Sequence, residues 1–287
     1  MNKFPSLVVF LLTLILISCS PAPKEESTPT PDITPSTLTP TEVPFESMAM
    51  ILLEEGEALN IHLEPNEESA IIESLVANAV QVLHTGEGEI NDEVLWAEIK
   101  ASTTGPGWVQ ARYLTEYIPP QDFCLDTRIS FLLDDFKIAL ENEDSQLFAS
   151  LVSPTHGLDL RYYRYGTLAN YTSQEATWAF KSEYAINWGN EPGSGFAKVG
   201  TFNEIPLPIL KEVFSANYEL YCNDAGIAAT FALEPWPFEY KNINFYQVFK
   251  PGTEQYGGID WQSWLVGVEY IDAEPYLFAL IHFEWAP

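Results

Sequence analysis

Basic side chains are scarce in this sequence of 287 residues. It holds 13 Lys and Arg residues against 41 Asp and Glu residues, which gives a formal net charge of −28 at pH 7. So negative a surface repels nucleic acid and anionic lipid headgroups, which excludes nucleic acid as a partner. We interpret the charge as one that keeps the protein soluble rather than as a cation-binding feature.

The motifs of several common enzyme classes are also missing. The chain has no phosphate-binding Gly-x-x-x-x-Gly-Lys-Ser/Thr loop, no Gly-x-Ser-x-Gly elbow and no His-Glu-x-x-His pair. We therefore predict a protein that is not an enzyme and that uses no cofactor and no metal ion. The alternative is an enzyme or small-ligand-binding protein with its pocket in the C-terminal domain, which would gather His156, His282 and Glu284 with Asp159 and Asp260.

Cysteine occurs only three times, as Cys19, Cys124 and Cys222. Two isolated cysteines do not make a zinc site. In an exported protein, Cys124 and Cys222 can form a disulfide that closes a loop of about 100 residues. The alternative is a pair of buried thiols that never meet, because the sequence does not show how far apart they lie in space.

No apolar run at the amino terminus is long enough to span a bilayer. The stretch Leu7–Ile17 follows Lys3 and suits the hydrophobic region of a secretion signal instead. The tetrapeptide Leu16-Ile17-Ser18-Cys19 resembles the lipobox of bacterial lipoproteins. This resemblance implies a signal peptide over residues 1–18 and a diacylated Cys19 that anchors the protein to the bacterial cell membrane, on its extracytoplasmic side. The alternative is an ordinary cleavable signal that happens to contain a cysteine.

Residues 19–45 have the composition of a linker. Seven prolines lie between Ser20 and Pro44, together with many Ser and Thr residues and hardly any apolar side chain. Such a segment cannot bury enough surface to offset the entropy lost on ordering. We expect the lipidated cysteine to be followed by a disordered Pro/Thr-rich stalk that holds the folded domains away from the membrane.

Between residues 46 and 118 apolar residues alternate at period two, with turn residues every eight to twelve positions, which indicates short strands. The segments "EALNIHLEPNEESAIIESL", "VQVLHTG", "LWAEIK" and "GPGWVQARYLT" follow the order seen in bacterial SH3-type domains. The resemblance implies a small all-β SH3-like barrel in which Gly107 forms a sharp turn and Leu114 fills the barrel end.

Domains of this family commonly bind cell-wall peptides or other envelope ligands. On that basis the ligand-binding candidates are Trp96 and Tyr113, through stacking and apolar contact, and His62, which stands where the family usually has Arg. The alternative is a purely structural barrel in which these aromatic side chains hold strands together.

The period changes after Leu125. Apolar residues follow helical spacing through two short helices, and Thr172-Ser173-Gln174-Glu175 predicts a further helix start. A helix is also expected over Ile209–Tyr221. The strands "INFYQVF", "WQSWLVGVEYI" and "PYLFALIHFEWA" end the chain, the last two as a hairpin.

The predicted fold class is thus the small barrel over residues 46–118 plus a C-terminal α+β domain over 119–287, with helices packed on an antiparallel sheet in a plain or cone-like form. This order resembles the nuclear-transport-factor-2-like or cystatin-like cone. It also resembles an uncharacterised domain of bacterial exported proteins, from which no function follows.

Six of the eight tryptophans follow residue 160. Aromatic side chains at this density line a carbohydrate or peptide cleft, or else fill a core. We expect a binding or targeting role in the cell envelope, with the membrane reached through the lipid anchor and with a cell-wall peptide or an envelope protein as partner. A structural spacer within a larger complex is the third possibility.

Overall fold

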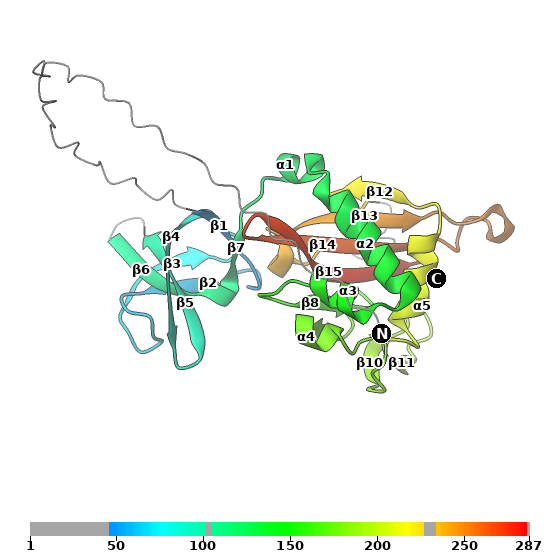
Figure 1. Ribbon diagram of the computed structural model, residues 1–287, viewed down its shortest axis with the longest axis horizontal. Coiled ribbons are helices and arrows are strands. Elements are labelled where there is room, and N and C mark those ends of the chain that lie inside the picture. The colour runs from blue at the N-terminus through cyan, green and yellow to red at the C-terminus, as the bar shows by residue number, and fades with distance from the viewer. Residues whose placement is uncertain (1–45, 102–104, 227–233, 286–287) are drawn as a thin grey trace, which may run out of the picture. The chain divides into compact units, whose positions relative to one another are not determined.

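The computed structural model describes residues 46–101, 105–226 and 234–285, all within one compact unit (Figure 1). The signal peptide, the lipidated Cys19 and the stalk expected over residues 1–45 lie outside the described residues. Within the described part of the chain, no helix is both long enough and apolar enough to cross a membrane.

The first part of the chain forms a seven-stranded antiparallel sheet with the strand order β3-β2-β6-β5-β4-β1-β7. Its elements are β1 (Glu46–Met50), β2 (Ala58–His62), β3 (Ile71–Val76), β4 (Val80–Asn91), β5 (Val94–Ala101), β6 (Gly105–Gln110), the 3-10 helix η1 (Ala111–Tyr113) and β7 (Leu114–Glu116). The alternating pattern places one set of apolar side chains in a common core, among them Leu59, Ile61, Val82, Ala97, Ile99 and Leu114. Leu63 departs from the pattern and is exposed, because β2 ends at His62.

Gly107 lies inside strand β6 and not in a turn, and it is needed there because a larger side chain would not fit. It lies within β6 opposite Ile99, and a Cβ atom there would come within 2.5 Å of the Ile61 Cγ2 atom and 2.8 Å of the Ile72 Cδ1 atom. The turn expected at Gly107 is therefore wrong. The positive φ of this segment, +94°, belongs to Gly105 instead.

The second part of the chain is built on a six-stranded mixed sheet with the order β12-β13-β14-β15-β8-β9. Its strands are β8 (Leu158–Arg161), β9 (Leu168–Tyr171), β12 (Glu219–Cys222), β13 (Asn244–Lys250), β14 (Gln262–Ile271) and β15 (Glu274–Glu284). The expected hairpin of the last two strands is confirmed, because β14 and β15 pair antiparallel along their whole length and run through the middle of the sheet (Figure 1). Parallel pairing occurs between β15 and β8, and β10 (Ile186–Asn190) pairs with β11 (Ala197–Gly200) in a separate two-stranded sheet.

Five α-helices lie in the described residues: α1 (Pro120–Leu125), α2 (Arg128–Asn142), α3 (Ser145–Leu151), α4 (Ser173–Ala176) and α5 (Pro206–Ser215). Two short 3-10 helices, η2 (Phe238–Tyr240) and η3 (Glu254–Tyr256), complete the elements. The helix start expected at Thr172 is confirmed by a capping box with Glu175. The helix expected over Ile209–Tyr221 is only partly right, since α5 ends at Ser215 and the next segment forms β12 against β13.

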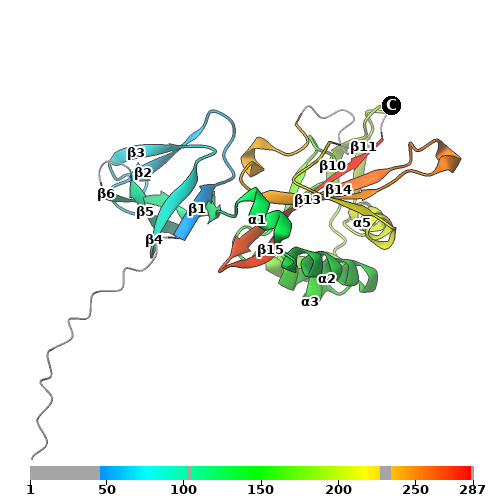
Figure 2. The same cartoon turned by 90° about the horizontal axis from the view of Figure 1, so that it is seen from above.

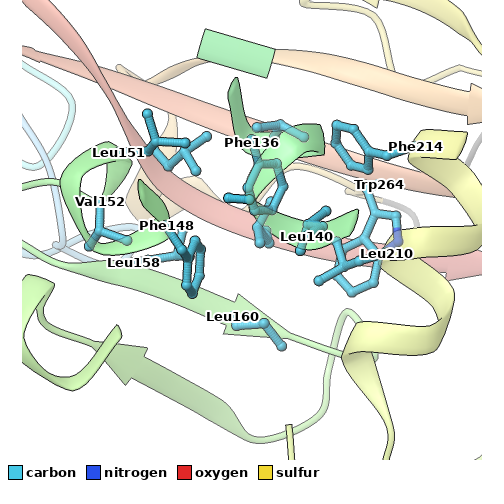
Figure 3. Close-up of a cluster of buried hydrophobic side chains, with 14 of the residues drawn as sticks. Phe136, Leu140, Phe148, Leu151, Val152, Leu158, Leu160, Leu210, Phe214 and Trp264 are labelled. Atoms are coloured by element: carbon cyan, nitrogen blue, oxygen red, sulfur yellow. The ribbon is translucent and has the colours of Figure 1, made fainter. Parts of the chain in front are cut away.

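The main core lies between the second sheet and helices α2, α3 and α5, which cover one of its faces (Figure 2). Figure 3 shows the apolar side chains that meet there, which include Phe136 and Leu140 of α2, Phe148 of α3, Phe214 of α5 and Trp264 of β14. A third apolar cluster contains Tyr240, Phe245 and Phe278. Each large side chain that is fully buried contributes roughly 1.5–3 kcal/mol to the hydrophobic stabilisation.

The predicted fold class, a small barrel plus an α+β domain, is wrong. The described residues hold fifteen strands against five α-helices, arranged in open sheets, so the protein is mostly β. The first sheet does not close, because its outermost strands β3 and β7 stand at opposite ends of the strand order. In the second part, short segments satisfy the hydrogen-bonding N–H and C=O groups of their backbone by pairing with other strands. Thus β8 pairs with β15, and β12 pairs with β13.

Candidate functional site

The three ligand-binding candidates lie together. His62 at the end of β2, Trp96 in β5 and Tyr113 in η1 line one groove with a volume of about 480 Å³. These residues are far apart in the sequence, and the pairing of β6 with both β2 and β5 draws their strands together. This volume falls within the range of small-ligand sites.

Trp96 lies beneath the groove. The residue is only 2% exposed, and the His62 ring stands edge-on to the indole with ring centroids 5.4 Å apart. The Nδ1 atom of His62 lies 3.2 Å from the Ser69 carbonyl oxygen, which holds the imidazole in place. Trp96 therefore supports the groove from below, and little of its indole surface is open to a ligand.

Arg112 and Tyr113 form one wall of the groove. The Arg112 guanidinium lies 4.6 Å from the centre of the Tyr113 ring, and its Nη2 donates to the Tyr113 Oη atom at 2.6 Å. Arg112 is exposed and has five N–H donors, so donors remain for an acceptor in the groove. Only its position beside Tyr113 marks Arg112 in the sequence, and no motif singles it out.

Two carboxylates complete the lining on the polar side. Glu57 and Glu67 are both exposed, and Gln110 Nε2 donates to Glu67 Oε1 at 2.6 Å. The groove thus combines acceptors from two carboxylates and donors from one guanidinium with the side chains of Tyr113 and Ile71. Such an arrangement can hold a ligand that carries apolar, basic and acceptor groups, and it offers no activated nucleophile.

The residues of the alternative enzyme site lie in different surroundings. His156 follows α3 in a turn, where its Nδ1 atom lies 2.7 Å from Glu269 Oε2 and its ring packs edge-on against Phe278. His282 lies in β15, buried between Trp264 and Tyr162. The two imidazoles therefore have different contact partners.

The environment of His282 keeps its imidazole neutral. Burial lowers the pKa of His282 to about 3. Its Nδ1 atom lies 3.2 Å from the Tyr162 carbonyl oxygen, and its Nε2 atom has no hydrogen-bond partner among the described residues. Burial also raises the pKa of the Glu284 carboxyl group, at the end of the same strand.

The two aspartates of the alternative site have structural partners as well. Asp159 accepts hydrogen bonds from Tyr240 Oη at 2.5 Å and from Asn170 Nδ2 at 2.8 Å, and burial raises its pKa. Asp260 accepts from the backbone N–H and the hydroxyl group of Thr253. Among the described residues, no group of three or more His, Cys, Asp or Glu side chains is placed to hold a metal ion.

Cys124 and Cys222 are joined in a disulfide, with their Cα atoms 5.8 Å apart. The bond ties α1 to β12, the edge strand of the second sheet. The sequence left this pairing open, because only the fold shows that the two thiols meet. Comparison with known proteins adds no identity to these observations: the chain matches no family model, no curated protein and no solved structure.

Proposed function

We propose that this protein is a non-catalytic binding protein of the bacterial cell envelope, anchored by a lipid on the extracytoplasmic side of the membrane. One observation carries the binding role: His62, Trp96 and Tyr113 line a single groove of about 480 Å³. The Cys124–Cys222 disulfide supports export, because disulfides persist in oxidising compartments. The anchor rests on the lipobox-like sequence that ends at Cys19.

The chemistry of the groove favours a peptide ligand. Glu57 and Glu67 offer acceptors to an amine, while Arg112 offers donors to a carboxylate or a carbonyl oxygen. Tyr113 and the exposed Ile71 offer apolar surface between these charges. Peptides of the cell wall combine amines, carboxylates and small apolar side chains, so we expect such a peptide in the groove. A polyanionic ligand is disfavoured by the net charge of −28.

Co-sedimentation of the purified protein with cell-wall sacculi tests the proposal. We expect the wild type to pellet and the variants Tyr113→Ala and Arg112→Ala to stay in the supernatant. Arg112 is exposed and Tyr113 is half-buried against the core of the first sheet, so circular dichroism would verify that each variant keeps its fold. The matched control is Tyr165→Ala, which removes an exposed tyrosine outside the groove and should pellet like the wild type.

Each result separates one part of the proposal from another. If the wild type does not pellet, a wall peptide is the wrong ligand and an envelope protein becomes the partner to seek. If all variants pellet equally, the protein binds the wall through another surface and the groove has no part in it.

A further inference from the structure

A second cleft lies between two strands of the C-terminal part. It has a volume of about 580 Å³, and its walls include residues 167–171 and 184–187. The first stretch contains β9 and the second leads into β10. A strand turns alternate side chains to opposite faces, so a cleft lined by consecutive residues of a strand runs along the edge of that strand.

Both walls present open strand edges. β9 is the last strand of the six-stranded sheet and pairs with β8 on one side, while β10 pairs with β11 in a separate two-stranded sheet. Every second residue of an edge strand directs its N–H and C=O groups away from the sheet. The cleft is therefore bordered by backbone donors and acceptors from two different sheets.

The two strands converge at one end of the cleft. A Cβ atom on Gly166 would lie 2.3 Å from the Trp188 carbonyl oxygen, and one on Gly189 would lie 2.8 Å from the Gly166 Cα atom. The absence of side chains at these two glycines lets the backbones meet there. Beyond this contact the walls separate and leave the cleft between them.

The side chains of the cleft are mostly apolar or aromatic, and apart from Glu175 they are uncharged. Trp178 is 65% exposed and Tyr184 is 75% exposed, which are unusual values for large aromatic residues that also line a concave surface. Glu175 is the charged residue of the lining, and its carboxylate already accepts from the backbone N–H and the hydroxyl group of Thr172. The cleft thus offers aromatic surface and strand edges and has little unpaired charge.

We infer that this cleft binds an extended peptide segment of a partner protein, which adds to the edge of β9 as a further strand. Backbone pairing with β9 supplies the hydrogen bonds, and apolar side chains of the peptide pack on Trp178 and Tyr184. The wall of five residues matches a peptide of about five residues, roughly 16 Å long. The segment carries apolar or basic side chains and lacks Asp and Glu, since the net charge of −28 repels acidic peptides.

Panning a phage-displayed library of random heptapeptides on the purified protein tests this site. We expect enriched sequences that are apolar or basic and poor in acidic residues. Synthetic copies should bind the wild type and lose at least about tenfold in affinity to Trp178→Ala and Tyr184→Ala, as measured by calorimetry. The matched control, Tyr165→Ala, removes a tyrosine that is 72% exposed outside the cleft and should bind like the wild type.

Methylation of backbone nitrogens in the enriched peptide tests the strand pairing itself. An added strand pairs through every second residue, so we expect N-methylation to abolish binding at alternate positions and to be tolerated between them. Tolerance at every position, unchanged binding to Trp178→Ala, or a failure to enrich any peptide would each overturn the inference. Trp178-dependent binding of a neutral oligosaccharide with no peptide binding would make the cleft a saccharide site instead. The groove of His62 and Trp96 lies elsewhere, so Tyr113→Ala should bind these peptides normally.

Discussion

His156 and Glu269 form a buried pair, with 2.7 Å between the imidazole Nδ1 atom and the Glu269 Oε2 atom and with side chains 5% and 0% exposed. Two residues of the first part of the chain complete the arrangement. The Arg112 carbonyl oxygen lies 3.2 Å from His156 Nε2, and the Thr115 hydroxyl group donates to Glu269 Oε2 at 3.3 Å. Both ring nitrogens of His156 thus have an oxygen atom within hydrogen-bond distance. Through its contacts with Arg112 and Thr115, the pair links the first part of the chain to β14.

Loss of the Glu269 carboxylate should therefore destabilise the protein strongly. Glu269→Ala leaves a buried imidazole without its partner, and we expect the free energy of unfolding to fall by about 3–5 kcal/mol. Urea unfolding followed by fluorescence would measure it. The exposed Glu254→Ala is the control and should change stability by less than about 0.5 kcal/mol. Equal unfolding midpoints for Glu269→Ala and the wild type would show that the pair adds no stability.

The disulfide between Cys124 and Cys222 should stabilise the fold through the long loop that it closes. The two cysteines are 98 residues apart, and we expect reduction to lower the free energy of unfolding by roughly 2–5 kcal/mol. Urea unfolding with and without a reducing agent measures this difference. The Cys124→Ser variant should match the reduced wild type and should not respond to the reductant. A reductant effect of equal size in that variant would assign the loss to another cause.

Acidification should weaken the protein through His282. An exposed imidazole in the unfolded chain takes up a proton near pH 6.5, while the folded protein holds the pKa of His282 at about 3. The unfolded state therefore binds more protons between these values, and stability falls as the pH decreases, by up to about 1.4 kcal/mol per pH unit. The contribution of His282 is fully present above pH 6.5.

Comparing how steeply the free energy of unfolding falls with pH in a His282 variant and in the wild type separates the effect of His282 from that of the other histidines. Urea unfolding at pH 7, 6 and 5 should show a shallower loss of stability in His282→Gln than in the wild type. The hydrogen bond from Arg128 holds the pKa of Asp126 at about 2, so that carboxyl group weakens the fold only as the pH falls below about 4, outside this window. Parallel slopes for the two proteins would mean that His282 is protonated to the same extent in both states.

Gly107 should tolerate no larger residue. In Gly107→Ala the new methyl group would press against Ile61 and Ile72 in a packed core, and we expect a loss of about 1–3 kcal/mol in the free energy of unfolding. The control is Gly88→Ala in β4, where a Cβ atom would meet its nearest neighbour at an ordinary 3.5 Å. A greater loss in Gly88→Ala than in Gly107→Ala would contradict the steric explanation.

Local patterns in the sequence predicted local structure well. The alternation of Leu59 and Ile61 indicated a strand with one buried face, and both side chains lie in the core of the first sheet. The Thr172-x-x-Glu175 pattern indicated a helix start, and the capping box is formed. These predictions succeed because the backbone conformation of a short segment depends mostly on its own side chains and their periodicity.

Long-range features could not be read in the same way. The fold class was predicted wrongly because strands such as β15 and β8 pair although they lie more than a hundred residues apart. No local sequence pattern records such pairing or shows which strand edges stay open. Glu269, the partner of His156, lies 113 residues away and was not selected. The cleft between β9 and β10 was also not predicted, because the abundance of tryptophan was equally consistent with a filled core.

The sequence by itself determined the acidic character of this protein, its short alternating strands, its final hairpin and the aromatic residues that line the groove. The tertiary structure decided which of these meet: Trp96 with His62, Cys124 with Cys222, and the edges of β9 and β10 around one cleft. The physical reason is the same in each case. Composition and periodicity act within a few residues, whereas contacts between distant segments form only when sheets and helices bury their apolar faces together.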